Sequence, residues 1–208
     1  MALHMKVKVC GIRRLEDALV AVDAGAWALG FIFHRPSPRY IAPEEAAKII
    51  ERLPGHVLTV GVFVDYSIDE LNDVVSRAGL GAAQLHGAET PEYARQVEAS
   101  TVIKAFRVSD EFDISSLEPY EDCRILLDTY RAGQAGGTGE TFDWEIARRV
   151  GEKTPVILAG GLDPDNVREA IRIARPVGVD VSSGVETAPG VKSAAAIRRL
   201  FEAVGGRG

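Results

Sequence analysis

The chain has 208 residues, of which 46% are hydrophobic and 26% are charged, and its formal net charge at pH 7 is −6. This size and composition suit one hydrophobic core, so we expect a single domain over residues 1–208. An acidic chain without a basic cluster is a poor partner for nucleic acid. No apolar run approaches the roughly 20 residues that cross a bilayer.

The N-terminus and the cysteines indicate where the protein works. The opening MALHM lacks the basic region and the long apolar stretch of a secretory signal. Residues 1–4 are a candidate cloning remnant ahead of a native start at Met5. The two cysteines, Cys10 and Cys123, are too few for a disulfide framework. We therefore expect a soluble, cytoplasmic protein.

One pattern recurs along the chain: a short apolar run is followed by a stretch with helical periodicity. The runs are almost continuously apolar, as expected for strands that are covered on both faces. The predicted strands span residues 6–10, 27–33, 58–64, 82–86, 101–108, 124–128, 155–159 and 177–181.

The predicted helices lie between and after these strands and carry recognisable end signals. Gly25 is a C-cap signal, Pro43 suits a first helical position, and Ser67 with Glu70 predicts a capping box. The segment after the fifth strand is weaker, and only a turn or two of helix is expected there. The predicted helices span residues 15–25, 43–53, 67–79, 90–100, 142–151, 163–174 and 193–205.

Strands that alternate with helices predict an α/β fold with a parallel sheet, because parallel strands need a crossover connection. Eight such units point to a closed (β/α)8 TIM barrel with few insertions. An open doubly wound sheet is the alternative. It often carries a GxGxxG motif after its first strand, and VCGIRR at that position lacks the motif.

The loops AGGLDP and VSSGVE follow the last two predicted strands, and both are short and rich in small residues. Small residues let backbone N–H groups approach an anion, and these two loops are the usual phosphate site of a barrel. The alternative is that the glycines only turn the chain. The expected phosphate-binding residues are Gly160, Gly161, Ser182, Ser183 and Gly184.

A carboxylate and a thiol end two other predicted strands. Asp128 either works in a site, beneath a glycine-rich loop at 129–141 that could close over a ligand, or caps that loop. Cys10, beside Gly11, is either a small buried hydrophobe or a proton acceptor, because the usual thiol pKa of about 8.5 is near neutrality. Cys123 is expected to be structural.

Two more polar residues have two interpretations each. Arg39 lies in a loop stiffened by prolines, where a guanidinium either binds a carboxylate or phosphate or is solvated. His86 is either a ligand or acid, or a hydrogen-bonded structural histidine. The sequence has no HxH, HxxxH or Cys/His cluster, so neither a metal nor a cofactor is expected. The pattern favours proton transfer on a phosphorylated small molecule.

Together, these motifs make the chain similar to the phosphoribosylanthranilate isomerase family of tryptophan biosynthesis. The resemblance runs from Met5 over almost the whole chain. Each motif alone is weak, whereas the ordered set on the expected strands is highly specific. The motifs are KVCGI, LGFIF followed by SPRYI, VGVFV, QLHG, IKAFRV, LLD, GGTG, LAGGL and GVDVSSGVE.

The resemblance implies an activity and residue roles. The family reaction is the Amadori rearrangement of N-(5-phosphoribosyl)anthranilate to 1-(2-carboxyphenylamino)-1-deoxy-D-ribulose 5-phosphate, the third step from chorismate to tryptophan. By resemblance, Asp128 is the general acid for the ring oxygen, and Cys10 is the general base for the C2 proton. Arg39 is expected near the anthranilate carboxylate and Asp180 near the ribose hydroxyls.

Two alternative functions differ in their sequence features. Another phosphosugar isomerase or epimerase barrel would carry two aspartates with a half-barrel repeat, or a metal cluster, and neither is visible. A non-catalytic barrel that binds a phosphorylated ligand would need neither Cys10 nor Asp128. The expected partner is a small phosphorylated substrate, without nucleic acid or membrane, for a monomer or homodimer.

Overall fold

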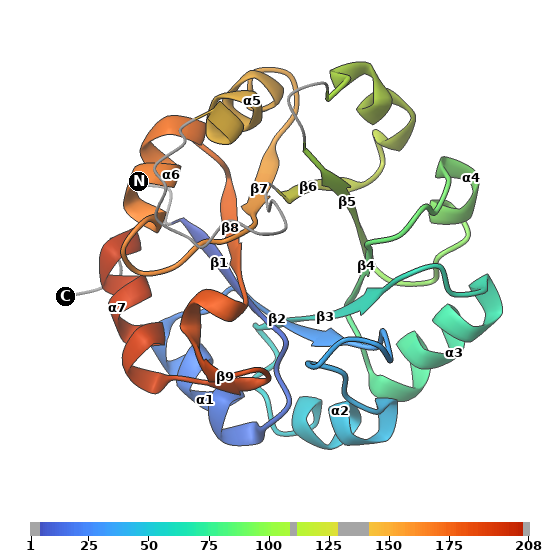
Figure 1. Cartoon of the computed structure of the whole chain (residues 1–208). Coiled ribbons are helices and arrows are strands. Elements are labelled where there is room, and N and C mark those ends of the chain that lie inside the picture. The colour runs from blue at the N-terminus through green and yellow to red at the C-terminus, as the bar shows by residue number, and fades with distance from the viewer. Residues whose placement is uncertain (1–4, 109–111, 129–141, 206–208) are drawn as a thin grey trace.

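The computed structural model describes residues 5–108, 112–128 and 142–205. Eight parallel strands close into a barrel in sequence order, with β8 paired to β1, so the predicted (β/α)8 barrel is confirmed (Figure 1). The strands are β1 (Lys6–Cys10), β2 (Ala28–Ile32), β3 (Leu58–Phe63), β4 (Ala82–Leu85), β5 (Thr101–Arg107), β6 (Arg124–Asp128), β7 (Val156–Ala159) and β8 (Gly178–Val181).

Helices surround the barrel, as Figure 1 shows. The predicted capping box of Ser67 and Glu70 is present, and Gly25 ends its helix in the left-handed conformation with φ 104°. Among the described helices, none combines the length and apolar character that crossing a bilayer requires. The helices are α1 (Leu15–Ala24), α2 (Pro43–Ile50), α3 (Ile68–Ala78), α4 (Pro91–Ala94), α5 (Phe142–Gly151), α6 (Val167–Ala174) and α7 (Ala194–Val204), with 3₁₀ helices η1 (Ile114–Tyr120) and η2 (Ser183–Val185).

Helix α4 is much shorter than the predicted helix at 90–100, which is wrong beyond Ala94. The side chain of Asn72 on α3 bonds the backbone of the following segment. Its Nδ2 donates to the Gln96 carbonyl at 3.1 Å, and its Oδ1 accepts from the Glu98 amide at 3.0 Å. In a longer helix, the Gln96 carbonyl and the Glu98 amide would form backbone hydrogen bonds. The contacts with Asn72 replace those helical hydrogen bonds.

A two-stranded antiparallel sheet follows η2 and was not predicted. It consists of β9 (Glu186–Ala188) and β10 (Val191–Lys192). The amide of Lys192 donates to Asp17 Oδ2 on α1 at 3.1 Å, in a buried position. This small sheet therefore anchors Glu186 and Lys192 near the ends of β8 and β1.

Two apolar clusters fill the fold. The larger one lies between the barrel and the helices, and includes Val7 and Val9 of β1. Successive residues of a strand point to opposite faces, so Lys8 and Cys10 point into the barrel. The smaller cluster fills the barrel interior, and consists of Ala28, Val60, Ala82, Ile103, Ala105, Leu126, Ile157 and Ala159. Polar side chains are thus left for the C-terminal end of the barrel, hereafter the mouth.

Candidate active site

An ion pair between β1 and β8 lies beside the thiol of Cys10. The register pairs Lys8 with Asp180, and Lys8 Nζ lies 2.8 Å from Asp180 Oδ2. Lys8 is 0% exposed and Asp180 is 8% exposed, so both charges are removed from water. Asp180 Oδ1 is also buried, and it has no hydrogen-bond partner among the described residues. A buried, unpaired carboxylate oxygen at the mouth is ready to accept a hydrogen bond from a ligand.

Gly30 on β2 makes room for this arrangement. A Cβ atom at Gly30 would lie 2.6 Å from Cys10 Sγ and 3.1 Å from Lys8 Nζ. Real side chains do not tolerate the first distance, so any larger residue would displace the thiol. Because both atoms approach the same point, the sulfur of Cys10 and the ammonium of Lys8 are neighbours.

The thiol of Cys10 is 5% exposed, and this burial raises its pKa because a thiolate loses solvation there. The cations of Lys8 and Lys192 act in the opposite direction, whereas Asp180 adds to the effect of burial. The pKa of Lys8 is raised: burial disfavours its ammonium, but Asp180 and Cys10 outweigh that cost. Cys10 is therefore a protonated thiol at neutral pH in this structure, beside a charged lysine.

Asp128 ends β6 on the inner face of the barrel and is 22% exposed. His86, just after β4, lies with Nε2 3.4 Å from Asp128 Oδ2. Gln84 Nε2 is 3.0 Å from His86 Nδ1. With the amide N–H donating to Nδ1, the histidine proton is on Nε2 and faces Asp128. His86 is therefore within ion-pair distance of the carboxylate, and both His86 and Asp128 act electrostatically on Asp180.

Arg39 forms a fork with Glu186 of β9. Its Nε lies 2.9 Å from Glu186 Oε1 and its Nη2 lies 2.7 Å from Oε2. Lys192 Nζ donates to the same carboxylate at 2.8 Å and to the Ser182 carbonyl at 3.1 Å. Burial alone would raise the pKa of Glu186, but these hydrogen bonds hold it below its ordinary value. The Nη1 group of Arg39 has no partner among the described residues, so one edge of the guanidinium is free for a ligand.

Gly11 brings the first strand against these groups. Its φ of +81° favours glycine, and a Cβ there would lie 2.8 Å from Arg39 Cδ and 3.2 Å from Ser182 Oγ. Cys10, Arg39 and Ser182 consequently meet at one side of the mouth.

The loops after β7 and β8 pack against each other. A Cβ at Gly184 would collide with the carbonyl of Leu162 and lie 2.8 Å from Asp163 Cβ. Gly160 and Gly161 have φ of 93° and 62°, and a Cβ at Gly161 would meet nothing within 4 Å. The buried Ser182 Oγ lacks a hydrogen-bond partner in the described part of the chain. The expected phosphate-binding loops are therefore adjacent, with small residues and an unused hydroxyl.

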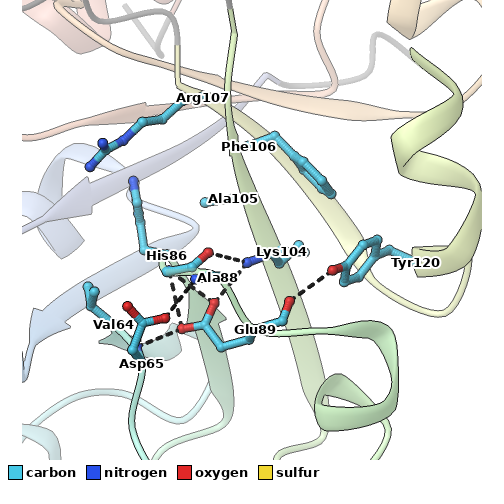
Figure 2. Close-up of a pocket in the computed structure, with 11 residues that line it drawn as sticks. Val64, Asp65, His86, Ala88, Glu89, Lys104, Ala105, Phe106, Arg107 and Tyr120 are labelled. Atoms are coloured by element: carbon cyan, nitrogen blue, oxygen red, sulfur yellow. Dashed lines mark hydrogen bonds and ion pairs between the residues drawn. The ribbon is translucent and has the colours of Figure 1, made fainter. Parts of the chain in front are cut away.

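A pocket of about 490 Å³ adjoins the mouth at the ends of β4 and β5 (Figure 2). Arg107 lines it beside His86 and pairs with Asp128 in the strand register. Deeper in the pocket, Lys104 Nζ lies 2.8 Å from Glu89 Oε2, and both side chains are buried. This second ion pair lies outside the barrel interior, because Lys104 alternates with the inward-facing Ala105.

Four residues named in the sequence analysis, Cys10, Asp128, Arg39 and Asp180, lie at the same mouth as the two glycine-bearing loops after β7 and β8. Sequence reasoning missed Lys8, Glu186 and Lys192. The signal for Lys8 was available, since a lysine two residues before Cys10 in an apolar strand must share its face. The glycine-rich loop at 129–141 lies outside the described residues, as do residues 1–4. Within the described ranges, no group of three His, Cys, Asp or Glu side chains could hold a metal ion.

The chain is similar to known proteins of one family. The family model of N-(5'phosphoribosyl)anthranilate isomerase matches residues 7–203. The isomerase of Geobacter sulfurreducens is 54% identical over 95% of this chain and 97% of its own length, and that of Geobacter metallireducens is 53% identical with the same coverage. The crystal structure of the Thermotoga maritima isomerase superposes with a TM-score of 0.90 at 44% identity, covering 97% of this chain and 98% of the other. A further isomerase structure, with a TM-score of 0.87 at 42% identity and the same coverage, holds reduced 1-(o-carboxyphenylamino)-1-deoxyribulose 5-phosphate.

Proposed function

The chain belongs to the N-(5'-phosphoribosyl)anthranilate isomerase family, and we propose that Cys10 and Asp128 carry out the proton transfers of its reaction. The protein is an isomerase of tryptophan biosynthesis. It converts N-(5-phosphoribosyl)anthranilate to 1-(2-carboxyphenylamino)-1-deoxy-D-ribulose 5-phosphate, an Amadori rearrangement. The observation that carries the proposal is that a thiol and a carboxylic acid face one mouth from β1 and β6.

Asp128 is the general acid. It donates a proton to the ring oxygen of the ribose as the C1–O bond breaks, and the nitrogen lone pair forms a Schiff base. Two features of its surroundings support this role. Asp128 is only partly buried at the end of β6, so a substrate can reach it, and the imidazole of His86 lies 3.4 Å from its carboxyl group.

Cys10 is the general base. Its thiolate removes the C2 proton, the C2 electron pair forms a double bond to C1 while the C1–N π electrons of the Schiff base return to nitrogen, and the enolamine then tautomerises to the ketone. The thiol must first lose its own proton, which burial opposes. Lys8 and Lys192 are the cations that favour the thiolate, so the same site that buries the sulfur also holds the charges that compensate it.

The binding roles follow from the free polar atoms. Arg39 offers Nη1 to the anthranilate carboxylate while Glu186 holds its other edge. Asp180 Oδ1 accepts a hydrogen bond from a ribose hydroxyl. The phosphate lies between the loops after β7 and β8, where its ligands are Gly160, Gly161, Ser182, Ser183 and Gly184.

The cellular setting belongs to the same proposal. A single domain works in the cytoplasm as a monomer or homodimer, on a small phosphorylated substrate. The Thermotoga maritima relative is described as dimeric, and monomers generated from it have been solved. Light scattering of the purified protein would decide between the two states.

Replacing the acid and the base separately tests the catalytic roles. Cys10→Ser and Asp128→Asn are each expected to lower kcat by about 10²–10⁴-fold, which is the usual contribution of one proton transfer. The loss of substrate fluorescence measures turnover, and circular dichroism reports the fold. Cys123→Ser and the surface variant Asp122→Asn are matched controls that should keep full activity. Near-normal turnover in Cys10→Ser or Asp128→Asn would remove that residue from its role.

A further inference from the structure

We propose that Lys8 is a positioning residue for Cys10: its ammonium, anchored by Asp180, faces the sulfur and stabilises the thiolate that acts as base. This inference rests on the proposed role of Cys10. Lys8 affects the reaction only through Cys10. It is not the acid, the base or one of the phosphate ligands assigned above.

The geometry commits Lys8 to this position. Lys8 and Cys10 are two residues apart on β1, so they share the inner face of the barrel. The Lys8 side chain is 0% exposed, and its Nζ donates a hydrogen bond to Asp180 Oδ2 at 2.8 Å. An ammonium has three N–H groups, so Lys8 has donors beyond the one that Asp180 accepts. The absence of a Cβ at Gly30 leaves space that both Lys8 Nζ and Cys10 Sγ approach.

The charges around Cys10 come from four elements. Lys8 lies on β1, Asp180 on β8, Lys192 on β10 and Arg39 in the loop after β2. Lys192 and Arg39 both bind Glu186, so that carboxylate offsets part of their positive charge. Lys8 is the largest cationic influence on the Cys10 thiol. It therefore decides more than any other charge how easily the thiol ionises.

Substrate binding strengthens this effect. A sugar hydroxyl that donates to the free Oδ1 of Asp180 draws negative charge away from Lys8, and the ammonium then acts more fully on the sulfur. Bound substrate also displaces water from the mouth, which increases the interaction between the remaining charges. The hydrogen bond between a ribose hydroxyl and Asp180 therefore also favours the thiolate of Cys10.

The thiolate of Cys10 can be titrated directly by its ultraviolet absorbance in a Cys123→Ser background, with the Cys10→Ser/Cys123→Ser protein as the blank. In Lys8→Met, we expect the thiolate to appear about one pH unit or more higher than in the parent, because an adjacent opposite charge is lost. The rising limb of the kcat–pH profile should move by the same amount. Lys153→Met, at an exposed position, is the matched control and should move neither curve.

A double variant keeps the test decisive if Lys8→Met leaves Asp180 unpaired and fails to fold. Lys8→Met/Asp180→Asn removes both buried charges, and its thiolate curve should still lie above that of the parent. Coincident thiolate curves in the parent and in every folded Lys8 variant would overturn the proposal. Because absorbance reads the thiol without turnover, an active Cys10→Ser enzyme would refute the base assignment separately and leave the measured effect of Lys8 on the thiol intact.

Discussion

Two of the buried lysine–carboxylate pairs in the described part of the molecule have the same separation and different surroundings. Lys104 and Glu89 lie 2.8 Å apart outside the barrel interior, and Lys8 and Asp180 lie 2.8 Å apart inside it. Every carboxylate oxygen of Glu89 is used: it accepts from Lys104 and from the amides of Asp65 and Gly87. Asp180 uses one oxygen, and the other is unpaired within the described residues.

This difference supports a structural role for the Lys104–Glu89 pair and a functional role for the Lys8–Asp180 pair. The saturated Glu89 joins the loops after β3 and β4 to Lys104 of β5, and Tyr120 of η1 donates to its carbonyl (Figure 2). The Glu89 carboxylate has no oxygen left to accept a hydrogen bond from a ligand, so the Lys104–Glu89 pair contributes to stability. A buried carboxylate with an unpaired oxygen lowers stability until a ligand donates a hydrogen bond to it. Native proteins retain such carboxylates mainly at functional sites. The degree of hydrogen bonding distinguishes the two pairs, since their charge and burial are alike.

The largest expected effect is on stability, in the saturated pair. Lys104→Met leaves Glu89 charged and buried, and should lower the free energy of unfolding by about 3–5 kcal/mol. Urea denaturation measures this change, and kcat of the folded variant should match the parent.

Lys48→Met is the matched control, because Lys48 pairs with Glu45 at 2.6 Å on the exposed surface. Its stability should stay close to that of the parent, because an exposed ion pair contributes little. Equal losses in the two variants, or a fall in kcat with Lys104→Met, would contradict the structural assignment of the buried pair.

An intermediate effect, on binding, is expected at the unsaturated mouth. Ser182→Ala removes a buried hydroxyl without a described partner, so stability should stay constant or rise. Its KM should increase about tenfold or more, because a hydrogen bond to a charged group contributes about 1.5–3 kcal/mol. Steady-state kinetics and urea denaturation measure the two quantities.

Ser193→Ala is the control, and it should change stability but not KM. Ser193 Oγ accepts from the Ala196 amide at 3.2 Å and caps α7, so its loss should cost about 1 kcal/mol of stability and leave KM unchanged. If Ser182→Ala keeps the parent KM, Ser182 is not a phosphate ligand.

The smallest effect concerns pH near the saturated pair. Burial raises the pKa of Tyr93 to about 12, with further contributions from the charges of Glu89 and Asp65. The unfolded phenol ionises at about 10. The stabilising contribution of the raised Tyr93 pKa is therefore complete below about pH 10 and is lost as the pH rises toward 12.

Tyr93→Phe should flatten the alkaline loss of stability, measured as urea midpoints from neutral pH to pH 11. At neutral pH it should cost about 1 kcal/mol, because Tyr93 Oη donates to the Tyr66 carbonyl at 2.9 Å. Parallel curves for parent and variant would show that Tyr93 does not titrate differently in the folded state.

The strands and most helices were predictable from local signals. The eight apolar runs coincide with β1 to β8 because strands covered on both faces need continuous apolar residues. The prediction for 90–100 failed since Asn72, in the preceding helix, takes over backbone groups of that segment. The sheet of β9 and β10 was missed for a related reason: its short strands are held by contacts to α1 that no local pattern contains.

At the site, sequence alone identified which residue types end the strands, but not their partners. Motif order placed Cys10, Asp128 and Asp180 at one end of a barrel. It did not show that Glu186 holds one edge of Arg39, nor that burial raises the pKa of Cys10. Both facts depend on segments that are distant in the chain.

The sequence by itself determined the alternation of strands and helices, the face on which each strand residue lies, and the family of the enzyme, because periodicity and motif order are properties of the linear chain. Only the tertiary structure decided which charges meet. Lys8 and Asp180 are separated by 172 positions and become neighbours when β8 pairs with β1 and closes the barrel. Closure also excludes water from that junction, and the low polarity there is what makes one lysine important to one thiol.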